Sequence, residues 1–173
     1  MSGHTTETPV REPNDPDRGV DLRTPTLDDG REMWRIARDS QVLDVNASYA
    51  YLLWCRDFSR TSVVATVDGR PGGFVSGFRR PDQPDTLMVW QVAVDEEHRG
   101  RRLATRMLEH LVDSVGPATL ETTITPDNAA SIALFTRFAE KRGADVEQAP
   151  VFEAAHFPDG HDAEMLFRIG PLR

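Results

Sequence analysis

The chain has 173 residues, of which 39% are hydrophobic, and a formal net charge of -8 at pH 7. That length is sufficient for one domain with a buried core. The acidic balance argues against a nucleic-acid partner, because phosphates are bound by basic faces. The sequence contains no run of about 18 apolar residues to span a bilayer, and residues 1–19 lack the apolar stretch of a signal peptide. We therefore expect a cytoplasmic protein without membrane or nucleic-acid partners.

The predicted elements describe an α/β domain. Residues 1–19 are polar and rich in Pro, Asp and Thr, which predicts a disordered tail before a single domain at 20–173. Periodicity and turn residues predict a strand, two helices, a hairpin, a central strand, a helix, a strand, a helix and two strands, at residues 20–23, 25–37, 47–58, 62–78, 86–94, 103–115, 119–125, 126–143, 146–152 and 164–169. This order indicates a mixed sheet flanked by about four helices, without an internal repeat.

Cap and turn residues set the expected limits of these helices. Thr26 or Asp28 is available to cap the first helix. Gly116 stops the helix that follows the central strand, and Thr125 with Pro126 is expected to cap and start the next one.

The stretch 86–94 is the strongest predicted strand. Its alternating sets of side chains are Leu87, Val89, Gln91 and Ala93 on one face, and Met88, Trp90, Val92 and Val94 on the other. Because both sets are largely apolar, we expect a central strand that is covered on both sides.

Cysteine and histidine usage points away from thiol and metal chemistry. Cys55 is the single cysteine and lies in an apolar run, which favours a buried structural thiol over a reactive nucleophile. His156 and His161 do not form part of a metal-ligand pattern, so no metal is expected.

The loop between the central strand and the next helix is rich in arginine. It contains Arg99, Arg101 and Arg102 directly before the expected helix start. The first N–H groups of a helix have no internal partner, and the helix dipole adds positive potential there, so this site favours phosphate. The alternative is an ordinary strand–loop–helix connection with a solvated basic patch.

Residues 99–104 resemble the pyrophosphate loop of the GNAT acetyltransferase superfamily, whose pattern is R/Q-x-x-G-x-G/A. The resemblance implies the GNAT acyltransferase fold and acetyl-CoA as cosubstrate. It also implies backbone contacts from the central strand to the pantetheine arm, and a further contact from the helix that follows the next strand. The cofactor-binding residues implied in this way are Val92, Ala93, Val94, Arg99, Gly100, Arg101, Arg102, Leu103, Ala104 and Asn128.

Two positions depart from the superfamily pattern. Arg102 stands where the family usually has glycine, so the backbone approaches the diphosphate less closely or the guanidinium supplies a compensating contact. Phe135 stands where a catalytic tyrosine is common, and a phenyl ring cannot donate a proton to the departing thiolate. Any general acid must then be another group.

Five separated segments are similar to the L-2,4-diaminobutyrate acetyltransferase family of ectoine biosynthesis. They are residues 43–53, 89–94, 121–128, 157–161 and 166–171, and the resemblance covers roughly 21–172. It implies direct transfer of acetyl to the γ-amine of the diamino acid, and a homodimer.

The chemistry of a diamino acid suggests which side chains bind it. Two ammonium groups require acidic partners, for which Asp44 and Glu164 are the candidates, with Trp90 as a wall and cation–π surface. Deprotonating an amine of pKa about 10.4 at pH 7 costs about 4 kcal/mol. Glu164 or His161 is a candidate to take that proton or position a water that does.

Each candidate also has a structural interpretation. Asp44 can cap a turn, Trp90 can belong to the core, and His161 can be an exposed turn residue. Glu121 can be structural or can line the amine channel. Two other functions stay open at this stage: acetylation of another small amine, and a non-catalytic acyl-CoA sensor.

Overall fold

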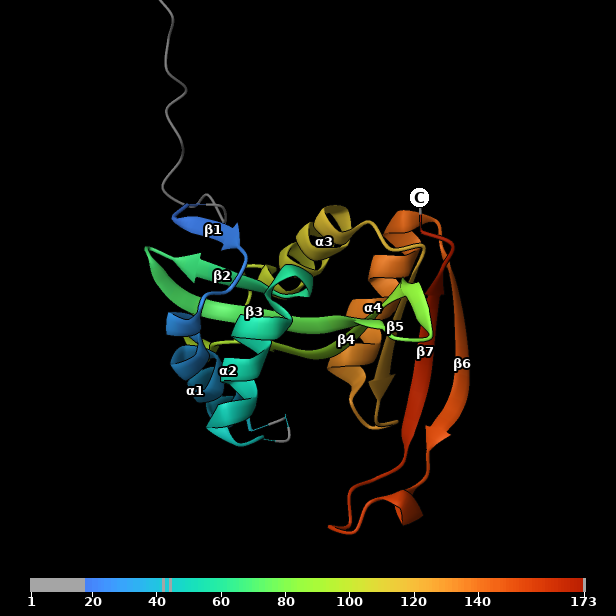
Figure 1. Ribbon diagram of the computed structural model, residues 1–173. Helices are drawn as coiled ribbons and strands as arrows, with labels where there is room; N and C mark the ends of the chain where they lie inside the picture. Colours follow the sequence, from blue (N-terminus) through green and yellow to red (C-terminus); the bar gives the residue numbers. More distant parts are fainter. Residues whose placement is uncertain (1–17, 42, 44, 173) are drawn as a thin grey trace, which may run out of the picture.

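The computed structural model describes residues 18–41, 43 and 45–172 (Figure 1). The strands are β1 (Val20–Arg23), β2 (Val63–Val67), β3 (Arg70–Arg80), β4 (Gln83–Val94), β5 (Thr119–Ile124), β6 (Asp145–Phe152) and β7 (Glu164–Gly170). The α-helices are α1 (Gly30–Ser40), α2 (Ser48–Asp57), α3 (Leu103–Val115) and α4 (Ala129–Arg142). Short 3-10 helices are η1 (Leu27–Asp29), η2 (Ser59–Thr61), η3 (Glu96–His98) and η4 (Ala154–His156). The predicted α/β class and order of elements are confirmed, whereas most of the predicted tail lies outside the described residues.

The seven strands form one mixed sheet in the order β1-β2-β3-β4-β5-β7-β6. Neighbouring strands are antiparallel except for the parallel pair β4 and β5. Helices α1 and α2 lie on one face, which we call the front face, and α3 and α4 lie on the other (Figure 1). The front-face helices cover the β3 and β4 half of the sheet. The front of β5 and β7 is therefore where a substrate can approach.

Two apolar clusters hold the layers together. The larger one packs α3 and α4 against the back of the sheet and includes Leu120, Ile124 and Phe167. The smaller one packs α1 and α2 against the front and includes Tyr51 and Cys55. The burial of Cys55 raises its pKa to about 11, so this thiol is neutral and structural, as expected.

Of the two predicted helix starts, the one capped by Thr26 is confirmed, and the one at Thr125 and Pro126 is wrong by a few residues. Helix α4 begins at Ala129 and is capped by Asn128, whose Oδ1 accepts a hydrogen bond from Ser131 N at 3.1 Å, so Thr125 is not the cap. Thr26 caps the short η1 helix, and α1 itself begins at Gly30. Hydrogen bonds from nearby side chains determine where these helices begin, and the sequence offers several polar residues near each start that could act as the cap.

The strict alternation predicted for the central strand is wrong at its middle. Ser76 of β3 pairs with Gln91, but Gly77 pairs with Val89, so Trp90 is an extra residue in β4. This is a β-bulge, and it turns Trp90 and Gln91 towards the front helices while Val89 and Val92 pack on the back.

No helix in the described ranges has the length and apolar character needed to cross a bilayer.

Candidate active site

The bulge in β4 lies where β4 and β5 separate. The two strands pair only from Thr86 with Thr119 to Val89 with Thr122, as far as the described residues show. Beyond that point, residues 90–94 turn backbone groups towards a gap instead of a neighbouring strand. Buried backbone groups require hydrogen-bond partners, so this gap is suited to an extended, amide-containing ligand.

The side chains of Val92, Ala93 and Val94 pack against the core clusters on the two faces. Only their backbone atoms are therefore placed to contact a ligand in the gap between β4 and β5. This placement fits the expected backbone contacts with a pantetheine arm.

The loop after β4 presents the amino end of α3. Gly100 has a φ of 81° and Arg102 a φ of 56°, both in the left-handed region. The hydrogen bond from Arg106 N to Arg102 O (3.0 Å) opens the helix, so the amides of Leu103 and Ala104 precede the first helical donor. Arg102 thus adopts the backbone conformation for which glycine is preferred at this position.

The arginines of this loop surround that helix end with positive charge. Arg99 is exposed, and its Nη1 lies 4.0 Å from Glu96 Oε1, which makes a long and weak ion pair. Arg101 donates to the carbonyl oxygen of Arg18 at 2.6 Å, and Arg102 is exposed. Oriented amides and guanidinium groups together fit a diphosphate.

Two contacts hold the start of the loop. Arg35 of α1 donates to Asp95 at 2.6 Å, and its bonds to Glu32 and Asp95 raise the pKa of the guanidinium. A Cβ atom added at Gly72 would lie 2.4 Å from the ring of His98, so this glycine allows the histidine to pack on β3. Nothing in the local sequence pattern marks either contact.

Asn128 and Phe135 occupy structural positions on α4. Asn128 uses Oδ1 to cap the helix, which leaves Nδ2 as the atom for the expected cofactor contact. Phe135 is buried in the core cluster behind the sheet. Its side chain supplies no proton, in agreement with the sequence interpretation.

A cluster of four aromatic side chains lies on the front face beside the gap. The ring centroid of Trp90 is 4.4 Å from that of Trp54 on α2, which is itself 4.7 Å from Phe58 and 6.3 Å from Phe78. Trp90 is therefore one wall of an aromatic cluster, half-buried rather than a fully enclosed core residue. The contact between Trp90 and Trp54, and the rings of Phe58 and Phe78 that pack on Trp54, were not predicted, because these residues become neighbours only in the folded sheet.

A buried hydrogen-bond network connects the bulge to the loop before α2. The Tyr51 hydroxyl donates to Gln91 Oε1 at 3.1 Å and is hydrogen-bonded by the backbone and side chain of Asn46. Burial raises the pKa of Tyr51, and these hydrogen bonds oppose that effect only in part. Asp44 lies outside the described residues, two positions before Asn46.

His161 and Glu164 lie together where β7 begins. The distance between His161 Nε2 and Glu164 Oε1 is 3.6 Å, and both side chains are largely covered. The ring of His161 is tilted against Phe157, with centroids 4.5 Å apart, so His161 is more than an exposed turn residue. His156 instead accepts a hydrogen bond from Glu153 N at 3.0 Å, which closes a turn.

Glu121 lies on the front of β5 and is 1% exposed. Arg80 donates to one of its oxygens at 2.8 Å, and Arg168 donates to the other at 2.7 Å. Both carboxylate oxygens are thus engaged by guanidinium groups, which places Glu121 poorly for proton abstraction. Within the described part of the chain, no three His, Cys, Asp or Glu side chains gather as a metal site.

Comparison with known proteins identifies the family. Residues 28–139 match the acetyltransferase (GNAT) family. The chain is 51% identical to the L-2,4-diaminobutyric acid acetyltransferase of Nocardia farcinica, covering 99% of this chain and 97% of the relative. It is 58% identical to the Streptomyces coelicolor enzyme of the same name, covering 88% and 94%. The chain is a diaminobutyrate acetyltransferase of the GNAT family.

A solved diaminobutyrate acetyltransferase agrees with this assignment. The enzyme EctA from Paenibacillus lautus, in complex with its substrate L-2,4-diaminobutyric acid and coenzyme A, is 40% identical and superposes with a TM-score of 0.84. The match covers 88% of this chain and 95% of that structure. As a GNAT diaminobutyrate acetyltransferase, the chain uses acetyl-CoA as its cosubstrate, which the gap and the α3 loop fit.

Proposed function

We propose that this diaminobutyrate acetyltransferase transfers acetyl from acetyl-CoA to the γ-amino group of L-2,4-diaminobutyrate. The product is N4-acetyl-L-2,4-diaminobutyrate, for ectoine biosynthesis. The observation that carries the proposal is the bulge at Trp90, which puts an aromatic, cation-binding wall beside the gap that fits acetyl-CoA. The solved relative that binds both diaminobutyric acid and coenzyme A supports it.

The residues on the amine side have separate roles in this reaction. Asp44 and Glu164 bind the ammonium groups, and Trp90 covers the acceptor. The pair His161 and Glu164 removes the proton of the γ-ammonium, directly or through water. The amine nitrogen then attacks the thioester carbonyl carbon in a ternary complex, the new N–C bond forms and the C–S bond breaks. The nitrogen loses its second proton to solvent to become the amide N–H, and the departing thiolate takes up a proton from solvent.

On the cofactor side, residues 99–104 and the capping side chain of Asn128 hold the cosubstrate, with the backbone of residues 92–94 along its arm. Direct transfer between the two bound substrates needs no acyl-enzyme intermediate. The burial and raised pKa of Cys55 support direct transfer, because they remove the only thiol in the chain as a nucleophile.

Two further features belong to the proposal. The active form is a homodimer, and the enzyme works in the cytoplasm on small molecules. Size-exclusion chromatography with light scattering tests the first, since a monomer at micromolar concentration would contradict it.

The activity is tested by mixing the enzyme with acetyl-CoA and L-2,4-diaminobutyrate and following free thiol. We expect thiol release that requires both substrates, and lower rates with lysine, ornithine or a polyamine. Equal rates across that panel would assign a general amine acetyltransferase instead. Tight binding of coenzyme A without turnover of any amine would favour an acyl-CoA sensor and overturn the proposal.

A further inference from the structure

We propose that Arg80 and Arg168, held in place by the buried carboxylate of Glu121, bind the α-carboxylate of the diamino acid. This assignment rests on the proposed function and names the group that selects an amino acid over a simple diamine. Arg80 and Arg168 would be specificity-determining residues, and Glu121 a positioning residue.

The charge of this cluster favours an anion. One carboxylate is shared by two guanidinium groups, so the cluster carries one net positive charge in a protein whose overall charge is -8. Glu121 is 1% exposed, whereas the side chains of Arg80 and Arg168 are 37% and 39% exposed. The positive groups thus face the open side of the sheet, and the negative group lies beneath them.

Both arginines are fixed before any ligand arrives. Each uses Nη1 to bond Glu121, and Arg168 Nη1 also donates to Gln83 at 3.3 Å. The five N–H donors of a guanidinium leave several for a second carboxylate in the same plane. Arginines held this way lose little side-chain entropy when they bind the substrate.

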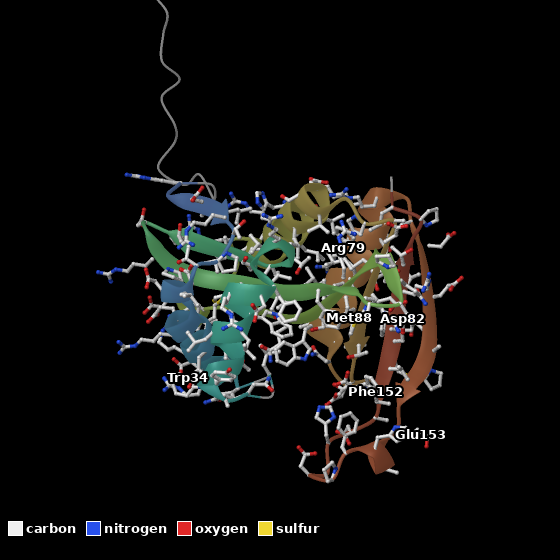
Figure 2. The ribbon with its side chains drawn as sticks, viewed as in Figure 1. Trp34, Arg79, Asp82, Met88, Phe152 and Glu153 are labelled. Carbon is white, nitrogen blue, oxygen red and sulfur yellow. The ribbon has the colours of Figure 1, made fainter. Side chains whose placement is uncertain are left out.

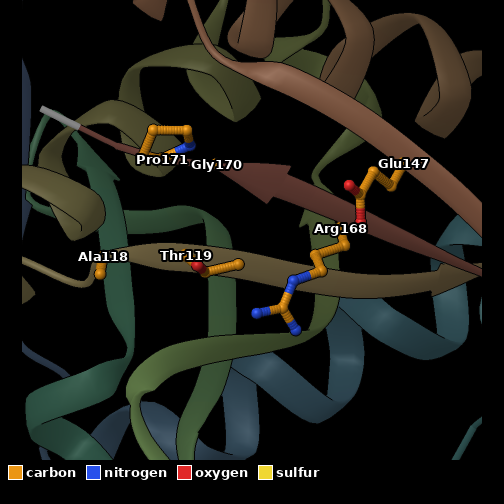
Figure 3. Close-up of a pocket in the computed structure, with 6 residues that line it drawn as sticks. All are labelled: Ala118, Thr119, Glu147, Arg168, Gly170 and Pro171. Carbon is orange, nitrogen blue, oxygen red and sulfur yellow. The ribbon is translucent and has the colours of Figure 1, made fainter.

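The cluster lies beside the point where the β4–β5 gap opens. Glu121 pairs with Met88 on one side and with Arg168 on the other, one residue before the last β4–β5 pair at Thr122. Trp90 follows Met88 by two residues, a rise of about 7 Å along the strand. Figure 2 shows Met88 over the middle of the sheet, and Figure 3 shows Arg168 reaching from β7 across β5. Three carbon atoms separate the carboxyl carbon from the γ-nitrogen in diaminobutyrate, so one molecule is of the right size for this distance.

The front face is also ordered by charge. In β7, Phe167 and Ile169 face the back cluster, so Glu164, Leu166 and Arg168 face the front. The acidic end with Glu164 lies towards the open gap, and the basic end with Arg168 lies at the paired end of β5. A zwitterion bound along this face would place its carboxylate on the arginines and its amines towards Trp90 and Glu164.

A hollow of about 270 Å³ beside Arg168 is a poorer position for the acceptor. It is lined by Ala118, Thr119, Glu147, Arg168, Gly170 and Pro171 (Figure 3). Thr119 and Gly170 lie at the ends of β5 and β7 that are farthest from the gap. Glu147 would also repel a carboxylate there, so the gap side of Arg168 is the productive one.

The test compares two acceptors that differ only in the carboxylate: L-2,4-diaminobutyrate and 1,3-diaminopropane. We expect Arg168→Gln and Arg80→Gln each to lower kcat/KM for diaminobutyrate about 10- to 100-fold, the usual effect of removing a charged hydrogen-bonding partner. The kcat/KM for 1,3-diaminopropane and the KM for acetyl-CoA should change less than about threefold. Arg142→Gln removes an arginine that donates to Asp113 on the α3–α4 side, and is the matched control.

Several outcomes would overturn the assignment. Equal losses with both acceptors would show that the cluster only fastens the β3–β4 hairpin to β5 and β7, and unchanged kinetics would show that it has no role. If Arg168→Gln unfolds, the double variant Glu121→Gln with Arg168→Gln removes the buried charge as well and should keep the same acceptor-specific loss. If the unaltered enzyme acetylates neither amine, the proposed function fails, and that result is separate from these.

Discussion

The two sides of the β4–β5 gap are built in different ways. On the cofactor side, most of the proposed contacts come from the backbone of strand residues 92–94 and from the amides at the start of α3, with the loop arginines and Asn128 beside them. On the acceptor side, the proposed contacts come from side chains, with Trp90 on β4 and both Glu164 and Arg168 on β7. Backbone groups are common to all residue types, whereas side chains determine which amine fits.

Because of this difference, we expect departures from the superfamily pattern to be tolerated better on the cofactor side. Arg102 has a φ of 56°, a left-handed backbone conformation that a glycine at this position would adopt readily. Phe135 keeps the core filled where a tyrosine is common. Equivalent changes on the acceptor side would alter the aromatic wall or a charge, so we expect them to lower activity towards the amine while binding of acetyl-CoA is retained.

The largest effect is expected from Trp90→Ala. Losing the aromatic wall should lower kcat/KM for diaminobutyrate about 100-fold, because a desolvated cation–π contact contributes about 2 kcal/mol and the packing against Trp54 is lost as well. The KM for acetyl-CoA should change less than about threefold. Trp90→Phe keeps a smaller aromatic ring and is the control. Its kcat/KM for diaminobutyrate in steady-state assays should lie between the values for the unaltered enzyme and for Trp90→Ala.

Asp44→Ala is expected to have the next largest effect. If Asp44 binds an ammonium group, kcat/KM for the amine should fall about 10- to 30-fold while affinity for acetyl-CoA is retained. Steady-state kinetics with each substrate varied in turn measures this difference, and Asp44→Asn is the control variant that keeps the size of the side chain and removes its charge. Equal losses for both substrates would instead assign Asp44 a role in supporting the fold.

A smaller effect is expected from Arg102→Gly. Glycine removes the steric cost of the left-handed backbone, so the free energy of unfolding should rise by up to about 1 kcal/mol and Tm by about 2–4 °C. Arg102→Ala keeps the Cβ atom and removes the guanidinium, so it separates strain from charge. A tenfold rise in the KM for acetyl-CoA in both variants would show that the guanidinium, rather than the amides, holds the diphosphate.

The smallest effect on activity is expected from Cys55→Ala. Its kcat should stay within about twofold of the unaltered enzyme in a steady-state assay, since the residue contacts no proposed substrate.

Burial raises the pKa of the Cys55 thiol from 9.0 to about 11. In the native enzyme the thiol should therefore react slowly with a disulfide reagent at pH 8, and quickly once the enzyme is unfolded. Because the unfolded thiol ionises first, stability should also decline above pH 9 as pH rises towards 11. Fast native labelling at pH 8 would contradict this.

Local patterns in the sequence were sufficient for the order of elements, since each element depends on residues that are close in the chain. They failed at Trp90, where a one-residue bulge changes which face each side chain occupies. They also missed the partners of Glu121, because Arg80 and Arg168 are 41 and 47 positions away. Contacts of that kind depend on strand order, which hydrophobic periodicity does not determine.

The most direct test of this account is the position of the acetyl group in the product. Enzyme, acetyl-CoA and L-2,4-diaminobutyrate are incubated, and the product is examined by two-dimensional NMR. We expect acetyl on the γ-nitrogen, seen as an amide proton coupled to the C4 methylene. Acetyl on the α-nitrogen, or no acetylated diaminobutyrate at all, would contradict it.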